Sequence, residues 1–78
     1  MNDGVAGSYT PFMEIVINGE LQQVPAPLSV VDLLRHLELQ GDRIAVELNH
    51  QIVRRDEWAA THLKDHDSLE IVQFVGGG

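Results

Sequence analysis

The 78-residue sequence contains no cysteine, and this absence excludes several kinds of chemistry at once. Without thiols the chain forms no disulfide, no thiolate metal site and no cysteine nucleophile. Any group that the protein carries is therefore held by something other than a side-chain thiol.

Basic residues and long apolar runs are also scarce. Five Lys and Arg residues stand against 12 Asp and Glu residues, and the formal net charge of −7 repels phosphate backbones and anionic lipid surfaces. No apolar stretch approaches the roughly 20 residues that a membrane span needs, and no secretory signal pattern is present. We therefore expect no nucleic-acid partner, no membrane partner and a cytoplasmic location.

The rest of the composition, 44% hydrophobic and 22% charged, is typical of a globular domain. Residues 1–11 mix Gly, Ser, Asn, Asp and Pro without apolar periodicity, so we expect a flexible leader, either natural or an added extension. Residues 12–75 should form one small domain that buries only about 60% of the surface of its unfolded chain. Residues 76–78 are expected to form a flexible glycine tail.

Two hairpins are expected, one on each side of a helix. The alternating run FMEIVIN from Phe12 predicts a strand, Asn18-Gly19 predicts a tight turn, and LQQV predicts the returning strand. The run RIAVEL, a turn at Asn49-His50 and a short strand at 51–53 predict the second hairpin. The last strand is expected over residues 69–75.

The segment between the hairpins carries the signals of one helix. Ser29 followed by Asp32 predicts a capping box at its start, and Gly41 is expected to end it. Apolar residues recur at the spacing of one helical face. They are Val30, Leu33, Leu34 and Leu37.

The remaining segments predict irregular connections. Residues 55–60 suit a single helical turn in which Trp58 anchors the connection in the core, and KDHDS at 64–68 has the composition of a tight turn. The order is β-β-α-β-β-turn-β, and the first and last strands are plausible parallel neighbours at the centre of the sheet. We therefore predict an α+β fold, a β-grasp (ubiquitin-like) roll with a mixed sheet of four to five strands and one main helix packed on one face.

Candidate metal and acid–base residues do not form a convincing site. His62 and His66 have the i, i+4 spacing of two helical ligands, but their neighbours indicate a turn, so we expect solvated histidines and no metal. The acidic residues, Asp67 among them, are scattered and are expected to serve solubility and attraction to a basic partner surface. No P-loop or nucleophile elbow is present.

The most informative stretch is QFVGGG at residues 73–78. Three glycines reach at most roughly 10 Å and lack Cβ atoms, so they could carry the carboxylate of Gly78 into a narrow active site of another protein. An unactivated carboxylate resists nucleophiles, so such chemistry needs ATP and an adenylating partner. Phe74 and Val75 belong either to the core or, if exposed, to a patch on which a partner docks.

Four stretches together resemble one known family. They are MEIVINGE from Met13, SVVDLL in the expected helix, AVELNHQIVRRDEW at 45–58 and DHDSLEIVQFVGGG at the end. From Met13 to Gly78 the chain resembles the ThiS-type sulfur carriers of thiamine biosynthesis. It departs from the family at Arg54, where proline is usual, and this change should alter a turn rather than the chemistry.

The resemblance implies a carrier without catalytic side chains or a bound cofactor of its own, monomeric when free. An E1-like adenylating enzyme would use ATP to activate Gly78, a cysteine desulfurase relay would supply a persulfide, and the resulting thiocarboxylate would deliver sulfur to thiazole synthase. Gly76 and Gly77 would thread through both partners. The absence of cysteine agrees with sulfur held at the backbone terminus.

Three other functions stay open at this point. The chain could be a small subunit of molybdopterin synthase, a ubiquitin-like modifier joined to lysines through Gly78, or a β-grasp interaction module that is not conjugated. The NHQIVRRDEW segment favours the thiamine carrier over the molybdopterin protein.

Overall fold

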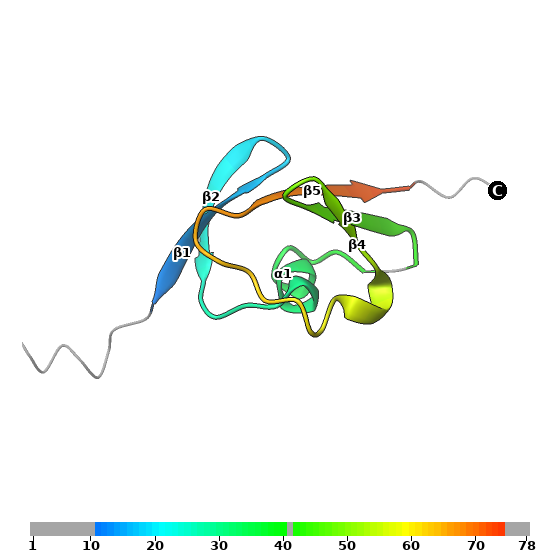
Figure 1. Cartoon of the computed structure of the whole chain (residues 1–78), viewed down its shortest axis with the longest axis horizontal. Helices are drawn as coiled ribbons and strands as arrows, with labels where there is room; N and C mark the ends of the chain where they lie inside the picture. The colour runs from blue at the N-terminus through cyan, green and yellow to red at the C-terminus, as the bar shows by residue number, and fades with distance from the viewer. Residues whose placement is uncertain (1–10, 41, 75–78) are drawn as a thin grey trace, which may run out of the picture.

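The computed structural model describes residues 11–40 and 42–74, which form a mixed five-stranded sheet with one α-helix (Figure 1). The element order agrees with the predicted β-β-α-β-β-turn-β. The elements are β1 (Phe12–Ile17), β2 (Glu20–Pro25), α1 (Val30–His36), β3 (Ile44–Leu48), β4 (Gln51–Val53), the 3-10 turn η2 (Arg55–Glu57) and β5 (Ser68–Gln73).

The strands lie in the order β2-β1-β5-β3-β4, so the last strand of the chain is the middle strand of the sheet. β1 and β5 are parallel and pair through Val16 with Ser68 and Ile17 with Leu69, whereas the other neighbours are antiparallel. The predicted parallel pair at the centre is therefore confirmed, and with it the β-grasp arrangement.

Both hairpin turns have two consecutive residues in the left-handed region. Asn18 and Gly19 have φ values of 50° and 84°, and Asn49 and His50 have φ values of 51° and 72°. Two positive φ values in a two-residue loop are typical of type I′ turns, whose twist matches that of the flanking strands. The two predicted turns are thus confirmed.

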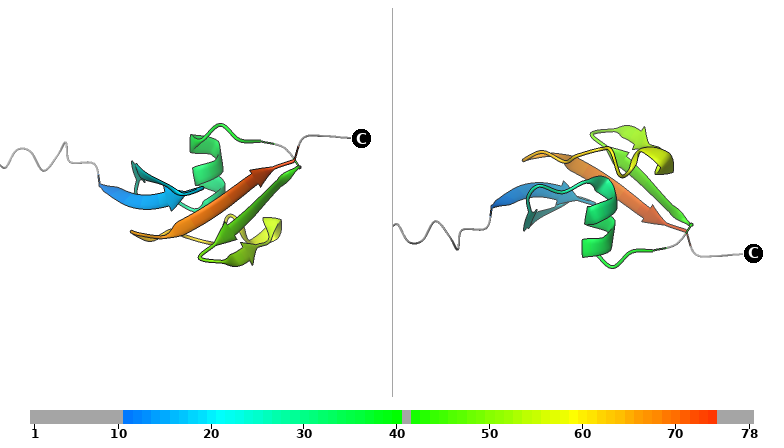
Figure 2. Two further views of the ribbon diagram at one scale, coloured as in Figure 1. Left: turned by 90° about the horizontal axis from the view of Figure 1, so that it is seen from above. Right: turned by 90° about the horizontal axis from the view of Figure 1, so that it is seen from below.

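The core lies between the sheet and α1, which crosses only one face of the sheet (Figure 2). Alternate residues of β1, namely Met13, Ile15 and Ile17, are at most 6% exposed, as period-2 alternation requires. The helix contributes Val30, Leu33 and Leu34 to the same cluster. The predicted apolar stripe is confirmed.

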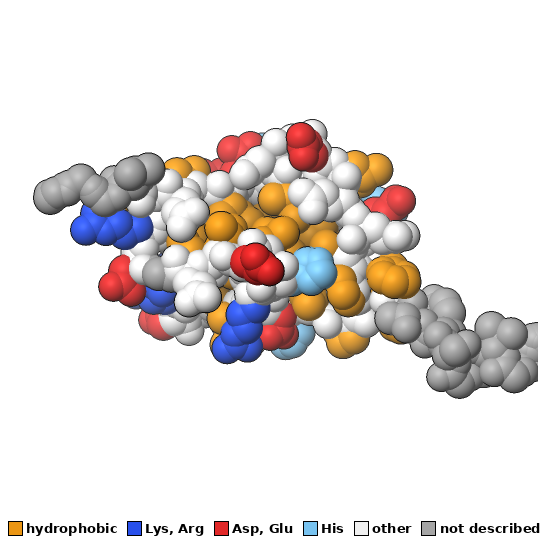
Figure 3. All heavy atoms as spheres, turned by 180° about the vertical axis from the view of Figure 1, so that it is seen from behind, with side chains coloured by type: hydrophobic (Ala, Val, Ile, Leu, Met, Phe, Trp, Pro, Cys, Tyr) orange, Lys and Arg blue, Asp and Glu red, His pale blue; other side chains and the backbone are white. Residues whose placement is uncertain are grey.

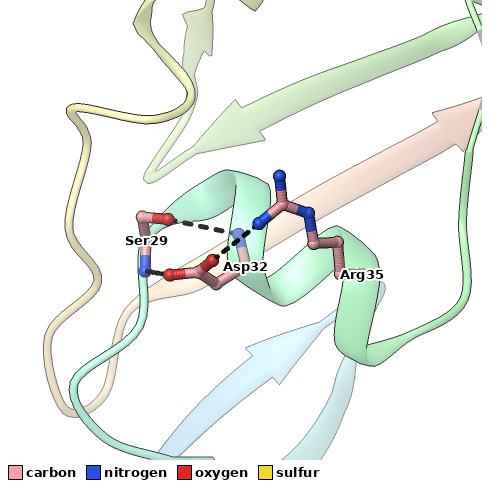
Figure 4. A network of polar contacts seen from close by, with 3 residues as sticks. All are labelled: Ser29, Asp32 and Arg35. Atoms are coloured by element: carbon pink, nitrogen blue, oxygen red, sulfur yellow. Dashed lines mark hydrogen bonds and ion pairs between the residues drawn. The ribbon is translucent and has the colours of Figure 1, made fainter.

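A capping box fixes the start of α1 (Figure 4). The Asp32 backbone N–H donates to the Ser29 hydroxyl at 3.1 Å, and the Ser29 backbone N–H donates to the Asp32 carboxylate at 3.4 Å. Arg35 lies 3.4 Å from the same carboxylate on the outer side of the helix. The predicted cap is confirmed, and it satisfies donors that a helix start otherwise leaves unpaired.

The prediction that Gly41 ends the helix is wrong. The helix ends at His36, and Glu38 takes the left-handed conformation with φ 61°. The Leu39 N–H donates to the Leu34 carbonyl and the Glu38 N–H donates to the Arg35 carbonyl, which is the Schellman pattern. The reversal lets Leu39 pack against the core, and this burial outweighs the modest strain of a non-glycine residue at positive φ.

Trp58 anchors the connection after β4, as predicted. It is 7% exposed and follows the single turn η2, and its indole Nε1–H donates to the Val53 carbonyl at 3.0 Å. The ring is therefore buried with its one polar group satisfied.

The turn before β5 confirms one prediction and overturns another. The reversal predicted in the KDHDS segment is present, with His66 at φ 73°. Asp67, however, is 5% exposed rather than solvated. Its carboxylate accepts hydrogen bonds from the Lys64 N–H at 2.7 Å and from the Asn49 side chain at 3.0 Å. The first bond closes the turn, and the second holds it against the β3–β4 hairpin.

Candidate functional site

The residues that the sequence singled out follow β5 along the chain. Val75, Gly76, Gly77 and Gly78 lie outside the described residues, so their predicted roles stay predictions. Phe74 is described, and its side chain is 55% exposed. Of the two alternatives for this residue, the core and the surface, the structure therefore selects the surface. The described part of the site is therefore the strand that leads to the glycines and the face that surrounds Phe74.

β5 is paired on both sides, but unequally. Five residue pairs join it to β3, from Leu48 with Leu69 to Ile44 with Gln73, and the Phe74 N–H adds a hydrogen bond to the Arg43 carbonyl at 2.7 Å. Only two residue pairs join it to β1. The end of β5 that approaches the glycines is thus held mainly by β3.

The side chain of Asn18 extends the shorter ladder. Its Oδ1 accepts from the Ile71 N–H at 2.8 Å and its Nδ2 donates to the Ile71 carbonyl at 3.2 Å. An amide side chain carries the same donor and acceptor as a peptide group, so Asn18 replaces the next residue of β1. Sequence reasoning used Asn18 only as a turn residue, because nothing local indicates a partner 53 positions away.

The second face of the sheet is not covered by α1 (Figure 2). We call it the open face, and strand alternation gives it the outward-pointing residues. Five of its large apolar members are 49–64% exposed, and Val16 is half-buried. The open face comprises Phe12, Glu14, Val16, Leu21, Gln23, Pro25, Ala45, Glu47, Ile52, Ser68, Glu70, Val72 and Phe74.

This arrangement explains why β5 is apolar at both parities. Leu69 and Ile71 point into the core, whereas Val72 and Phe74 belong to the open face. The sequence analysis placed this strand at the centre of the sheet, and the central position is confirmed. The second apolar set is nevertheless exposed, and contiguous exposed apolar side chains are characteristic of interaction surfaces.

Two carboxylates face each other across the centre of the open face. Glu47 of β3 and Glu70 of β5 are register partners, which places their Cβ atoms about 4.5–5.5 Å apart. Like charges at directly opposed positions destabilise a sheet. The outward positions of the strands include neither Lys nor Arg, so no cationic side chain on the strands themselves offsets this pair.

A groove lies on the other side of the molecule, between α1 and η2. Two of the residues that line it form a cation–π pair: the Arg55 guanidinium lies over the Trp58 ring, 4.6 Å from the ring centre. Among the described residues that line the groove there is one carboxylate, Glu38, and no histidine, so they provide no acid–base pair. The lining also includes Val31, Leu34, Arg35, Leu39, Gln40, Ile44 and Ala59.

The predicted histidines do not converge on a site. His62 and His66 are both exposed, and in the described part of the chain no three His, Cys, Asp or Glu side chains gather as metal ligands would. Seen from behind, acidic, basic and histidine side chains surround a central area of hydrophobic ones (Figure 3).

None of the helices within 11–40 and 42–74 has the length and apolar character that a membrane crossing requires.

Comparison with known proteins gives a consistent result. The model of the ThiS family matches residues 11–78. The chain is 42% identical over 66 residues to a thiazole synthase of Paramagnetospirillum magneticum, covering 85% of this chain but only 20% of that protein. It is 33% identical to the sulfur carrier protein ThiS of Escherichia coli, covering 85% of this chain and all of that one.

The solved structures agree with the sequence relatives. The crystal structure of the thiamine biosynthesis protein ThiS from Geobacter metallireducens superposes with a TM-score of 0.73 at 36% identity, covering 85% of this chain and 100% of that chain. The fold, the matched range and the sequence identity therefore lead to one conclusion. This chain belongs to the ThiS family of sulfur carriers.

Proposed function

We propose that the chain carries sulfur for thiamine biosynthesis as a thiocarboxylate on Gly78. The observation that carries the proposal is the family match, which runs through the three glycines to residue 78. The chain supplies the acyl group and no catalytic side chain, and it works in the cytoplasm. The lack of any thiol in the sequence supports a carrier that holds sulfur on its backbone.

The chemistry requires activation by a partner. An E1-like adenylating enzyme joins a carboxylate oxygen of Gly78 to the α-phosphorus of ATP, and pyrophosphate leaves. A persulfide from a cysteine desulfurase relay attacks the carbonyl carbon of the adenylate, and AMP leaves. A thiol then attacks the relay cysteine's sulfur and forms a disulfide with it, which breaks the sulfur–sulfur bond and releases the thiocarboxylate. Gly76 and Gly77, which lack Cβ atoms, fit the narrow approach to both partners.

Thiazole synthase is the proposed acceptor of the sulfur. Relatives that bear this name contain a stretch similar to this chain, which spans 20% of their length. A carrier-like segment inside a thiazole synthase supports a close working relation between the two proteins.

The open face is where we expect the adenylating enzyme to dock. Val72 and Phe74 offer apolar area next to the residues that must enter the partner, and the Glu47–Glu70 pair offers two adjacent negative charges. A partner surface with an apolar centre and basic groups complements both features.

Intact mass spectrometry tests the proposal. With an adenylating enzyme, ATP and a persulfide donor, the chain should gain the mass difference of one oxygen replaced by sulfur, located at Gly78 and lost when Gly78 is deleted. No gain would refute the carrier function and leave an interaction module. An isopeptide-linked product instead would indicate a protein modifier, and delivery to a molybdopterin synthase large subunit would indicate the other sulfur pathway.

Charge reversal tests the docking face separately. Glu47→Lys and Glu70→Lys should each weaken binding to the adenylating enzyme by about 10-fold, because each turns an attractive group at the interface into a repulsive one. Glu57→Lys makes the same charge change on the exposed turn η2, away from the open face, and should leave binding within about 3-fold. Equal losses in all three variants would show that only net charge matters.

A further inference from the structure

We propose that Asn18 is a site of spontaneous deamidation that the fold itself protects, and that its conversion loosens the central strand β5. The observation is the combination of an Asn-Gly turn with a side chain whose amide is hydrogen-bonded on both sides to the Ile71 backbone. The proposal does not depend on the sulfur-carrier function.

The turn has the chemistry that the reaction needs. The backbone nitrogen of Gly19 attacks the side-chain carbonyl carbon of Asn18, a carbon–nitrogen bond forms, and the amide nitrogen leaves as ammonia. Water then opens the cyclic imide at either carbonyl and leaves aspartate or isoaspartate at position 18. Gly19 has no side chain to hinder the attack, and the surroundings of its Cα are open, since an added Cβ would meet nothing within 4 Å.

The fold restrains the side chain that carries the reacting carbon. The Asn18 amide is bonded across to β5 at 2.8 Å and 3.2 Å, and both bonds are partly buried. The side chain must release both before it can turn back onto Gly19. Breaking two such bonds should slow the reaction by about 10-fold or more relative to the unfolded chain.

Conversion of the amide breaks one of the two hydrogen bonds between residue 18 and β5. A carboxylate at position 18 has acceptors only, so the Ile71 carbonyl loses its donor and faces negative charge instead. The β1–β5 ladder then ends after its two residue pairs. An isoaspartate also lengthens the backbone within a type I′ turn whose register leaves no room for an extra atom. The amide of Ile71 should therefore open to solvent more often.

The chain contains a matched control. Asn49 lies in the second type I′ turn, also with a hydrogen-bonded side chain, but His50 follows it in place of glycine. The full-length chain is incubated in mildly alkaline buffer, folded or in concentrated urea, and peptide mapping measures amide loss at each asparagine. We expect rapid loss at Asn18 in urea, at least about 10-fold slower loss in the folded chain, and slow loss at Asn49 in both.

Hydrogen exchange then tests the consequence. The deamidated protein and the variant Asn18→Asp should both exchange the Ile71 amide about 10-fold faster than the unmodified chain. Loss of ammonia from Asn18 at the same rate in the folded chain and in urea would overturn the protection. Unchanged exchange of the Ile71 amide after conversion would overturn the loosening of β5. The comparison of deamidation rates between the folded chain and the chain in urea uses only the unmodified protein, so it does not depend on the folding of a variant.

Discussion

The hydrogen bonds between Asp67 and Asn49 lead to a prediction that an exchange of the two side chains can test. Asp67 is buried and accepts from the Lys64 N–H and from the Asn49 Nδ2 group, while Asn49 Oδ1 accepts from the Ser68 N–H at 3.0 Å. Three donors, namely the Lys64 N–H, the Ser68 N–H and the Asn49 NH2 group, are thus satisfied by the Asp67 carboxylate and the Asn49 amide oxygen. Each single substitution breaks this match, and the double exchange restores it.

The magnitudes follow from the unmatched groups. In Asp67→Asn the side chain keeps only one oxygen for its two donors, the Lys64 N–H and the Asn49 NH2 group. The new NH2 group at position 67 therefore faces one of these donors, which should lower the free energy of unfolding by about 1–3 kcal/mol. In Asn49→Asp a second carboxylate oxygen faces that of Asp67, where the present contact is 3.0 Å, at a cost of about 1 kcal/mol or more even in water.

The double variant places the amide at 67 and the carboxylate at 49. The amide oxygen at 67 can accept from the Lys64 N–H, its NH2 group can donate to position 49, and the carboxylate there can accept from the Ser68 N–H as well. The net charge stays at −7. We therefore expect the exchange to recover at least about half of the summed loss of the two single variants.

Thermal and urea unfolding of the four chains measures the coupling. Each kcal/mol should lower the melting temperature by about 4–8 °C in a domain of this size. Asp42→Asn, at an exposed carboxylate, serves as the control for charge removal and should change stability by less than about 0.5 kcal/mol. The reasoning is refuted if the double variant is as unstable as the sum of the two single variants.

Four further substitutions test the core, the Trp58 hydrogen bond and the helix cap by urea unfolding. Ile15→Ala, at a position with no exposed surface, should cost about 2–5 kcal/mol, whereas Leu21→Ala, at 64% exposure, should stay within about 0.5 kcal/mol; similar losses would contradict the burial argument. Trp58→Phe leaves the buried Val53 carbonyl without its donor and should cost about 1–3 kcal/mol, and an unchanged midpoint would mean that the bond adds nothing. Ser29→Ala removes the N-cap and should cost about 0.5–2 kcal/mol, whereas a neutral result would show that the cap does not limit stability.

Local signals in the sequence were sufficient for most of the fold. Alternation placed the buried side chains of β1 and β3, the Asn18-Gly19 and Asn49-His50 pairs placed both turns, and Ser29 placed the helix start. Each of these features depends on residues within four positions of one another, so the chain specifies them without knowledge of the rest. The end of the helix was misplaced because Glu38, rather than a glycine, takes the left-handed position.

Part of the proposed site could also be predicted from the sequence, and part could not. The glycines at 76–78 and their possible chemistry were evident from the sequence, because that chemistry requires only a backbone carboxyl group and the absence of side chains. The sequence could not show that Phe74 is exposed or that Glu47 and Glu70 oppose each other. Both facts depend on which strands become neighbours and on which face α1 covers.

The sequence by itself therefore determined the elements, their order and the family to which the chain belongs. Tertiary structure alone decided the long-range roles of Asn18, Asn49 and Asp67, which include side-chain hydrogen bonds to groups 18 to 53 positions away along the chain. A polar side chain has the same local preference for turns whether it faces water or completes a ladder. Only the pairing of β5 with β1 and β3 brings these side chains to the backbone groups that they satisfy.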